Sequence, residues 1–230
     1  MNWVWRITKQ WKPSEDTISK TLMDILKEAC VDNIDDALSA FKLGANRLEY
    51  CSNLDEDGLT PLKEELISIK KLVSIPIRVM VRPHSKSFNY SESDILEMKS
   101  TIEFCKSQNF DGVVFGCLKT NFELDINLIS KLANFSKPLN VIIHKAIDST
   151  KFPLESLKKL IELKTVNGVL SSGGAVTAEL GIEILRKMVD IAPQNFEIIV
   201  AGKITNINID EIHKKICSGF YHGKKIVGEL

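Results

Sequence analysis

The chain has 230 residues, and its 30 Lys and Arg are balanced by 30 Asp and Glu, so its formal net charge at pH 7 is zero. This length suffices for one large core, and the charge balance argues against a nucleic-acid-binding protein. No apolar run approaches the length of a membrane span. Five cysteines without tight spacing are typical of a reduced, cytoplasmic protein rather than a disulfide scaffold.

The first 22 residues stand apart from the rest of the sequence. They contain Trp3, Trp5 and Trp11 but show no hydrophobic period, and their charges do not match a signal peptide. Met23 immediately precedes the first expected strand. We therefore interpret residues 1–22 as an extension and residues 23–230 as the folded domain. Two hypotheses stay open for the extension: a dispensable segment from an over-called start codon, or a short helix over 14–22 that caps one end of the domain.

Residues 26–51 predict a strand, a helix and a second strand. The first strand is expected over 26–31 and the second over 47–51, and apolar residues between them recur at helical spacing over 33–43. Asp32 is the expected N-cap, and Gly44 lies where a helix end favours a left-handed residue. Strands joined through a helix in this way run parallel.

The same alternation of strand and helix recurs to the end of the chain. Thr60 and Pro61 predict the start of the next helix. Ser91 and Asp94 predict a capping box, and Pro153 opens a later helix. Further strands are expected over 77–82, 112–116, 140–144, 168–172, 197–201 and 220–222, and the remaining helices over 125–135, 177–191 and around 209–216.

Eight strands alternating with about seven helices predict a single-domain (β/α)8 TIM barrel, an α/β fold. Only seven residues follow Gly223, so the eighth helix is expected to be short or missing. A doubly wound open sheet is the alternative. No GxGxxG motif follows the first strand, which weakens that alternative, and no nucleotide cofactor is expected.

The first two strands place charged residues and thiols on one face. Because side chains alternate along a strand, Glu28 and Cys30 share a face, and so do Arg47, Glu49 and Cys51. The opposite faces are mostly apolar and suited to packing against helices. The polar set is therefore expected inside the barrel, where charges must be paired because an unpaired buried charge is costly.

Several blocks of the chain resemble the CutC family, named for copper homeostasis. The blocks are EACVDN, GANRLEYCSNL, DGLTP, VMVRPHSKSFNYSESDILEMKSTI, DGVVFGCLKTNFELD, HKAID, LSSGG and FYHG, and the resemblance runs from Leu26 to Gly223. It implies the TIM barrel, a role in copper homeostasis and a homodimer or higher homo-oligomer. The chain departs from the family pattern in several places: Ala-Gly-Lys at 201–203 replaces a glycine triplet, HKAID replaces HRAFD, RPH replaces RPR, and the final histidine block lacks the usual serine.

The resemblance implies that Cys30 and Cys51 bind copper, because the two corresponding cysteines have been proposed as ligands in the family. Both lie near the ends of sequential strands, which are about 5 Å apart in a sheet. Soft thiolates select Cu(I), and a two-ligand site suits zinc poorly. The alternative interpretation is that both cysteines pack as small buried hydrophobes.

A second hypothesis is an enzyme acting on a small anionic metabolite, since TIM barrels carry active sites at the C-terminal ends of their strands. Its candidate catalytic acids and bases are Glu28, Glu49, His144 and His222. Its candidate substrate-binding residues are Arg47, Arg82, Asp148, Ser172 and Lys203. Among these, Arg82 is expected to hold an anion in bidentate fashion. The plain alternative for the charged residues is a structural ion network that fills the barrel.

Overall fold

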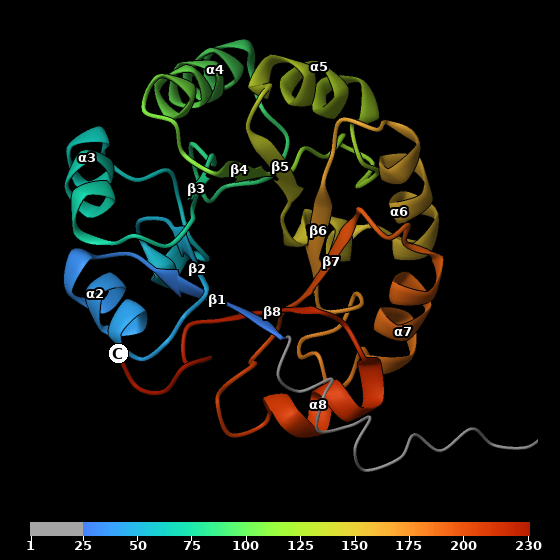
Figure 1. The fold of residues 1–230 in the computed structure, drawn as a ribbon. Helices are drawn as coiled ribbons and strands as arrows, with labels where there is room; N and C mark the ends of the chain where they lie inside the picture. Colours follow the sequence, from blue (N-terminus) through green and yellow to red (C-terminus); the bar gives the residue numbers. More distant parts are fainter. Residues whose placement is uncertain (1–24) are drawn as a thin grey trace, which may run out of the picture.

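Eight short parallel strands pair in chain order and close into a barrel, in a computed structural model that describes residues 25–230 (Figure 1). The predicted TIM barrel is confirmed, and the doubly wound alternative is wrong because the first strand pairs with the eighth. The extension over 1–22, the helix expected over 14–22 and the boundary at residue 23 lie outside the described residues.

Every described strand begins at the residue predicted for it and ends within two residues of the predicted end. The strands are β1 (Leu26–Val31), β2 (Arg47–Tyr50), β3 (Ile77–Met80), β4 (Gly112–Phe115), β5 (Asn140–Ile143), β6 (Gly168–Ser171), β7 (Glu197–Val200) and β8 (Phe220–Gly223). The helices are α2 (Ile34–Lys42), α3 (Lys63–Leu72), α4 (Glu92–Ser107), α5 (Ile126–Ser136), α6 (Pro153–Glu162), α7 (Ile182–Ile191) and α8 (Ile209–Ile216). Two 3₁₀ turns, η1 (Leu54–Glu56) and η2 (Lys145–Ser149), follow β2 and β5. Within the described residues no helix follows β8, as expected.

Two of the predicted helix starts are confirmed. Ser91 caps α4 in a complete capping box with Asp94, and Pro153 is the first residue of α6. The predicted cap of α2 is wrong by one residue: Asn33 is the N-cap, and its side chain accepts from the Asp36 amide at 2.8 Å. Asp32 instead accepts from the Leu54 amide at 3.0 Å, so its carboxylate holds the loop after β2.

Two other predicted helix starts are also wrong, because the residues involved contact neighbouring loops. The hydroxyl of Thr60 accepts from the Arg82 amide at 2.8 Å, and α3 begins only after its cap at Leu62. The segment 177–181 forms turns, and the Ala178 amide donates to the Gly202 carbonyl at 2.9 Å. The first turn predicted for α7 therefore bridges to the loop after β7.

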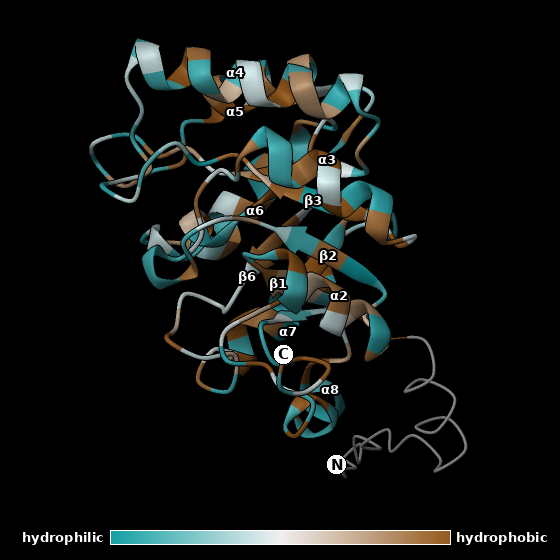
Figure 2. Cartoon of the chain, turned by 90° about the vertical axis from the view of Figure 1, so that its left-hand side faces the viewer, coloured by the Kyte–Doolittle hydropathy of each residue, from teal (hydrophilic) through white to brown (hydrophobic). Residues whose placement is uncertain are grey.

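The outer core lies between the strands and the ring of helices, which carry alternating hydrophilic and hydrophobic segments (Figure 2). A second, smaller core fills the barrel itself, and its buried members are Cys30, Cys51, Met80, Val114, Ile142, Leu170, Ile199 and Ala201. The apolar side chains of β4 to β7 therefore sit opposite the thiols of the first two strands. The buried Glu28, Glu49 and His222 lie with these thiols on the β1, β2 and β8 side.

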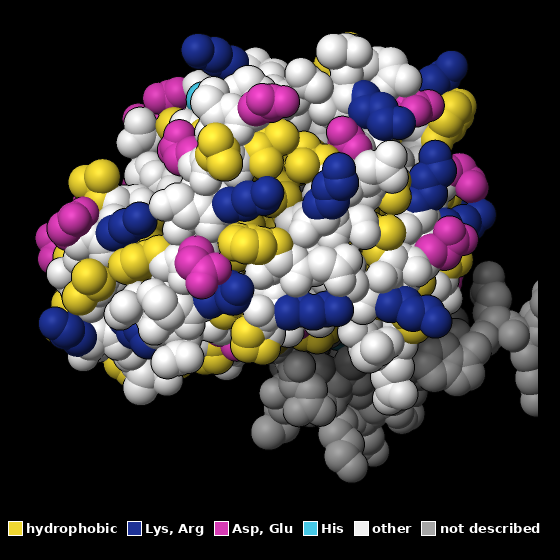
Figure 3. All heavy atoms as spheres, turned by 90° about the horizontal axis from the view of Figure 1, so that it is seen from above, with side chains coloured by type: hydrophobic (Ala, Val, Ile, Leu, Met, Phe, Trp, Pro, Cys, Tyr) yellow, Lys and Arg dark blue, Asp and Glu magenta, His cyan; other side chains and the backbone are white. Residues whose placement is uncertain are grey.

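The outer surface over α4 and α5 carries basic, acidic and apolar side chains in an interspersed pattern (Figure 3). Across residues 25–230, no helix combines the length and the apolarity needed to cross a membrane.

Candidate functional site

A layer of buried ion pairs closes the N-terminal end of the barrel. Arg47 Nε donates to Glu28 Oε2 at 2.5 Å, and Arg47 Nη2 donates to Glu197 Oε2 at 3.0 Å. Arg78 joins the same layer through Glu197, with N–O distances of 2.9 and 2.8 Å, and reaches Glu28 at 3.4 Å. The prediction that the interior charges are paired is confirmed for these four side chains, which we call the ionic layer.

Of the arginines considered for a structural ion network, Arg47 pairs with Glu28, whereas Arg82 donates to backbone carbonyls and Arg78 is the second arginine of the layer. Arg47, predicted to bind substrate, lies in the ionic layer and not among the residues that line the pocket described below. Although burial raises the pKa of Glu28, the hydrogen bond with His222 and the charges of Arg47 and Arg78 lower it to about 2. Glu28 is therefore an anion throughout the physiological range.

The two predicted thiol ligands lie side by side above this layer. Cys30 Sγ and Cys51 Sγ are 3.8 Å apart, and Cys51 Sγ also lies 3.4 Å from the Val31 carbonyl. Cys51 is fully buried and Cys30 is 8% exposed. The hydrogen bond with Cys51 and burial both raise the pKa of Cys30, so this thiol is protonated in the metal-free protein at neutral pH.

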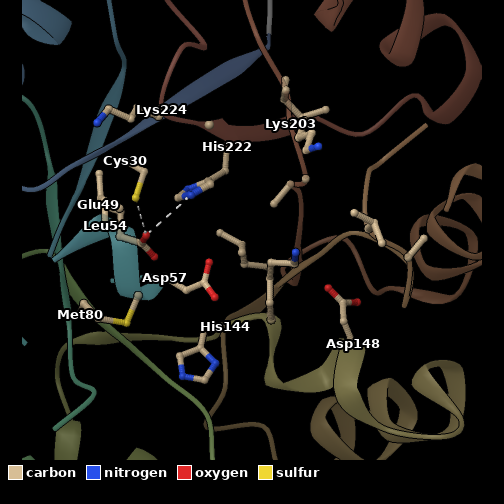
Figure 4. Close-up of a pocket in the computed structure, with 18 of the residues that line it drawn as sticks. Cys30, Glu49, Leu54, Asp57, Met80, His144, Asp148, Lys203, His222 and Lys224 are labelled. Atoms are coloured by element: carbon tan, nitrogen blue, oxygen red, sulfur yellow. Dashed lines mark hydrogen bonds and ion pairs between the residues drawn. The ribbon is translucent and has the colours of Figure 1, made fainter. Parts of the chain in front are cut away.

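Glu49 and His222 adjoin Cys30 on the pocket side of the barrel (Figure 4). The Cys30 thiol donates to Glu49 Oε2 at 3.3 Å, and His222 Nε2 lies 3.7 Å from the same oxygen. Burial raises the pKa of Glu49, and the nearby charge of Glu28 raises it further. Burial lowers the pKa of His222, but Glu49, Cys30 and Glu28 together raise it well above its usual value. His222 is thus an imidazolium between two carboxyl groups.

His144 lies on the other side of the pocket, immediately after β5. Its Nδ1 accepts from the Ala146 amide at 3.1 Å, which leaves the proton of the neutral ring on Nε2. Burial and the charge of Arg82 lower the pKa of His144 to about 3. A Cβ at Gly116 would lie 2.7 Å from the His144 ring, so only glycine fits beside it. His144 is therefore a neutral hydrogen-bond donor in this pocket.

Arg82 and Asp148, two of the predicted substrate-binding residues, line the pocket and also anchor its loops. Arg82 Nη1 donates to the carbonyls of Glu56 and Gly58 at 2.7 and 2.9 Å. Asp148 accepts from the Ser172 amide at 2.8 Å and from the Ser172 hydroxyl at 3.0 Å. Ser172 itself is not among the pocket-lining residues. Arg82 thus ties the loop after β2 to the segment after β3, and Asp148 ties the loop after β5 to the segment after β6.

The pocket opens at the C-terminal ends of the strands and has a volume of about 770 Å³. Lys145, Lys203 and Lys224 line it from three different loops, and none of them forms an ion pair with another described residue. Lys203 and Gly202 both have positive φ, 60° and 102°. The loop after β7 thus turns sharply at this point and brings Lys203 to the pocket wall.

The sequence reasoning missed several residues of this region. Arg78 shares parity with Arg82 in the strand predicted over 77–82, and Glu197 shares the inward face of β7 with Ile199, so the alternation rule could have identified both. Asp57, Lys145 and Lys224 lie on loops, where no periodic pattern indicates the direction of a side chain. Only the packing of those loops brings them to the pocket.

Comparison with known proteins identifies the family. The CutC family model matches residues 25–227, which is most of the chain. The chain belongs to the CutC family. The copper homeostasis protein cutC homolog of Homo sapiens is 35% identical over 187 residues, covering 81% of this chain and 68% of the human protein. The family protein CutC of Mesorhizobium japonicum is 36% identical over 190 residues, covering 83% of this chain and 73% of that protein.

Solved structures agree with this assignment. A structure named as a copper homeostasis protein CutC from Streptococcus agalactiae superposes with a TM-score of 0.83 at 26% identity, covering 88% of this chain and 99% of that one. A structure named as a phosphonomutase from Burkholderia cenocepacia superposes with a TM-score of 0.63 at 12% identity, covering 87% of each chain. The second likeness is one of fold alone. The relatives are named for copper homeostasis, and their names do not specify which residues of this chain would bind a ligand.

Proposed function

We propose that this CutC-family chain serves copper homeostasis by binding Cu(I) between the thiolates of Cys30 and Cys51. The observation that carries the proposal is the 3.8 Å separation of the two sulfur atoms. A metal–thiolate bond is about 2.3 Å long for zinc, so two sulfurs at this distance can both contact one ion. Relatives that carry the name copper homeostasis protein support the same metal.

The surroundings of the two thiols suit a soft monovalent ion. Met80, whose thioether is also a soft donor, belongs to the same interior core as Cys30 and Cys51. The remaining members of that core are apolar and offer no further ligand atoms. Free thiols persist in a reducing compartment, so the proposal places the protein in the cytoplasm.

An anaerobic competition titration with a chromophoric Cu(I) chelator tests this proposal. Wild type and Cys217→Ser, which removes an exposed thiol outside the pair, are expected to withdraw one equivalent of Cu(I) from the chelator. Cys30→Ser and Cys51→Ser are each expected to lose that equivalent while keeping the wild-type circular dichroism spectrum. Equal Cu(I) affinity in wild type and a Cys30→Ser, Cys51→Ser double variant would refute the proposal.

The pocket supports a second candidate function, an enzyme that acts on a small anionic metabolite. Two thiolates need neither a cavity of about 770 Å³ nor the side chains of Lys145, Lys203 and Lys224 around it. Glu49 Oε1 is buried and has no hydrogen-bond partner within residues 25–230, which suits a carboxyl group that binds a ligand. The raised pKa of Glu49 suits a general acid, and the neutral His144 ring, with its proton on Nε2, can donate a hydrogen bond to a substrate oxygen.

A screen of anionic metabolites by thermal shift tests the second candidate. A true ligand is expected to raise the melting temperature of wild type and to lose affinity in Lys203→Met, because a cation at the pocket wall is removed. Leu62→Met, an exposed apolar position outside the pocket, is the matched control. A ligand that stabilises Lys203→Met as strongly as wild type would argue against this pocket as the anion site.

A further inference from the structure

Three donors of different chemistry meet on the pocket face of the barrel: the Cys30 thiol, the Glu49 carboxyl group and the His222 imidazole (Figure 4). One ligand atom from each lies within 4.8 Å of the other two. They come from β1, β2 and β8, which are neighbours around the barrel. The backbone pairing of these strands therefore fixes the three side chains in one cluster.

Two of the three distances in this cluster are close to those around a tetrahedral divalent metal. With bonds of about 2.3 Å to sulfur and about 2.0–2.2 Å to nitrogen and oxygen, tetrahedral zinc ligands lie about 3.4–3.6 Å from one another. Cys30 Sγ is 3.3 Å from Glu49 Oε2, and His222 Nε2 is 3.7 Å from the same oxygen. The third pair, from Cys30 and His222, lies within 4.8 Å.

The orientation of His222 is the one that metal-bound histidines adopt. Its Nδ1 is 2.9 Å from Glu28 Oε1, which leaves Nε2 directed at Glu49. Metal ligands of this type almost always donate their second ring nitrogen to a carboxylate or carbonyl, which fixes the tautomer and makes the ring more basic. Glu28 is itself held by Arg47. The ionic layer thus supplies the supporting carboxylate that such a ligand needs.

A second observation points to an absent ligand. Glu49 is 2% exposed, yet its Oε1 has no hydrogen-bond partner among the described residues. Buried carboxylate oxygens are normally satisfied. Cys30, Glu49 and His222 all line the pocket, so a fourth ligand, a water or an anionic group, can approach from it. Three protein ligands and one open position are typical of catalytic zinc sites.

We propose that Cys30, Glu49 and His222 bind a divalent metal ion of the zinc class, with one coordination position open to the pocket. This inference goes beyond the Cu(I) proposal, because a carboxylate and an imidazole define the site rather than Cys51. The two sites share Cys30, so one ion excludes the other. The lysines of the pocket wall favour an anionic fourth ligand.

Cobalt substitution tests the site directly. Metal-stripped wild type is titrated with Co²⁺, and we expect near-ultraviolet absorption from a Co²⁺–thiolate bond together with the visible bands of a tetrahedral ion. Added Zn²⁺ should remove both signals at one equivalent. Cys217→Ser is the matched control and should give the wild-type spectrum. A wild-type spectrum without the thiolate band would overturn the proposal.

Variants then separate the two metal sites. Glu49→Gln, which keeps the shape of the side chain, and His222→Gln are each expected to weaken Zn²⁺ binding at least about 10-fold, the lower bound for losing a supporting contact of a metal ligand. Neither should change Cu(I) binding, whereas Cys51→Ser should lose Cu(I) and keep Co²⁺ and Zn²⁺. Circular dichroism verifies the fold of each variant. If His222→Gln does not fold, the Zn²⁺ affinity of Glu49→Gln alone tests the divalent site.

The outcomes distinguish the two proposals. Unchanged Zn²⁺ affinity in Glu49→Gln overturns the divalent site and leaves the Cu(I) proposal standing if Cys51→Ser still loses Cu(I). Retained Cu(I) affinity in Cys51→Ser overturns the Cu(I) proposal and leaves the divalent site standing if Glu49→Gln loses Zn²⁺.

Discussion

Arg78 is the residue whose replacement should most clearly reveal the energetic role of the ionic layer. Its side chain is 2% exposed and donates to Glu197 through two short contacts of 2.9 and 2.8 Å. It also lies 3.4 Å from Glu28 and 3.6 Å from Asp111. Arg78→Met keeps most of the side-chain volume and removes the charge. The change therefore isolates the electrostatic contribution.

The expected cost is about 3–5 kcal/mol, the range for removing one partner of a buried ion pair. Glu197 and Glu28 keep Arg47 as a partner, but Glu197 loses two hydrogen bonds to a charged group, each worth about 1.5–3 kcal/mol. Urea unfolding at pH 7, followed by circular dichroism, measures the difference. Lys158→Ala, which removes an exposed pair with Glu155, should change the stability by less than about 1 kcal/mol.

A double variant shows whether the cost comes from the unpaired charge. Adding Glu197→Gln to Arg78→Met should cost less than the sum of the two single changes, with a coupling of about 1–3 kcal/mol. If Arg78→Met were as stable as wild type, or if the two changes were additive, our account of the ionic layer would be wrong.

Three other predictions concern the pocket and one helix cap. The pKa of His144 is about 3 in the folded protein and about 6.5 in the unfolded chain, so the unfolded state binds more protons between these values. The free energy of unfolding should therefore fall by about 2 kcal/mol from pH 7 to pH 5. In urea titrations at both pH values, His144→Gln should lack this contribution to the fall. Ser91→Ala removes the cap of α4 and should cost about 1 kcal/mol in the same assay. Gly202→Ala places a Cβ 2.8 Å from Ser172 Cβ at a φ of 102°, and should lower stability by about 2 kcal/mol, read from thermal unfolding.

Each of these predictions has an outcome that contradicts it. An unchanged pH slope in His144→Gln would mean that another group takes up the proton. Wild-type stability of Ser91→Ala would mean that the capping contacts add nothing, and a fully stable Gly202→Ala would mean that the loop after β7 can relax.

The strands were predictable because most of them are buried on both faces and therefore appear in the sequence as short apolar runs whose first residues are easy to recognise. The helix starts were less predictable, because a capping side chain can bond either its own helix or a neighbouring loop. Asp32 and Thr60 both carry the right chemistry for a cap, and both contact loops instead. Local sequence cannot distinguish these choices, since the competing partner lies 22 residues further along the chain in each case.

The part of the candidate site that lies on strands was predictable from the sequence, whereas the part that lies on loops was not. Alternation along strands places Glu28, Cys30, Glu49 and Cys51 inside the barrel, as the structure has them. It does not say that Asp148 would be used to join two loops, nor that Lys224 would reach the pocket. Those positions depend on how loops from distant parts of the sequence pack at one end of the barrel.

The pairing of β1 with β8 sets Glu28 directly opposite His222, residues separated by 194 positions in the chain. The cluster built on this pair therefore forms only when the first and last strands of the domain have come together. A chain that ended before residue 220 would still contain both cysteines but would lack His222, the imidazole of the three-donor set. An ion held there would preferentially stabilise the finished fold over any partly assembled form. Metal binding at this cluster would thus require that the first and last strands of the domain are paired.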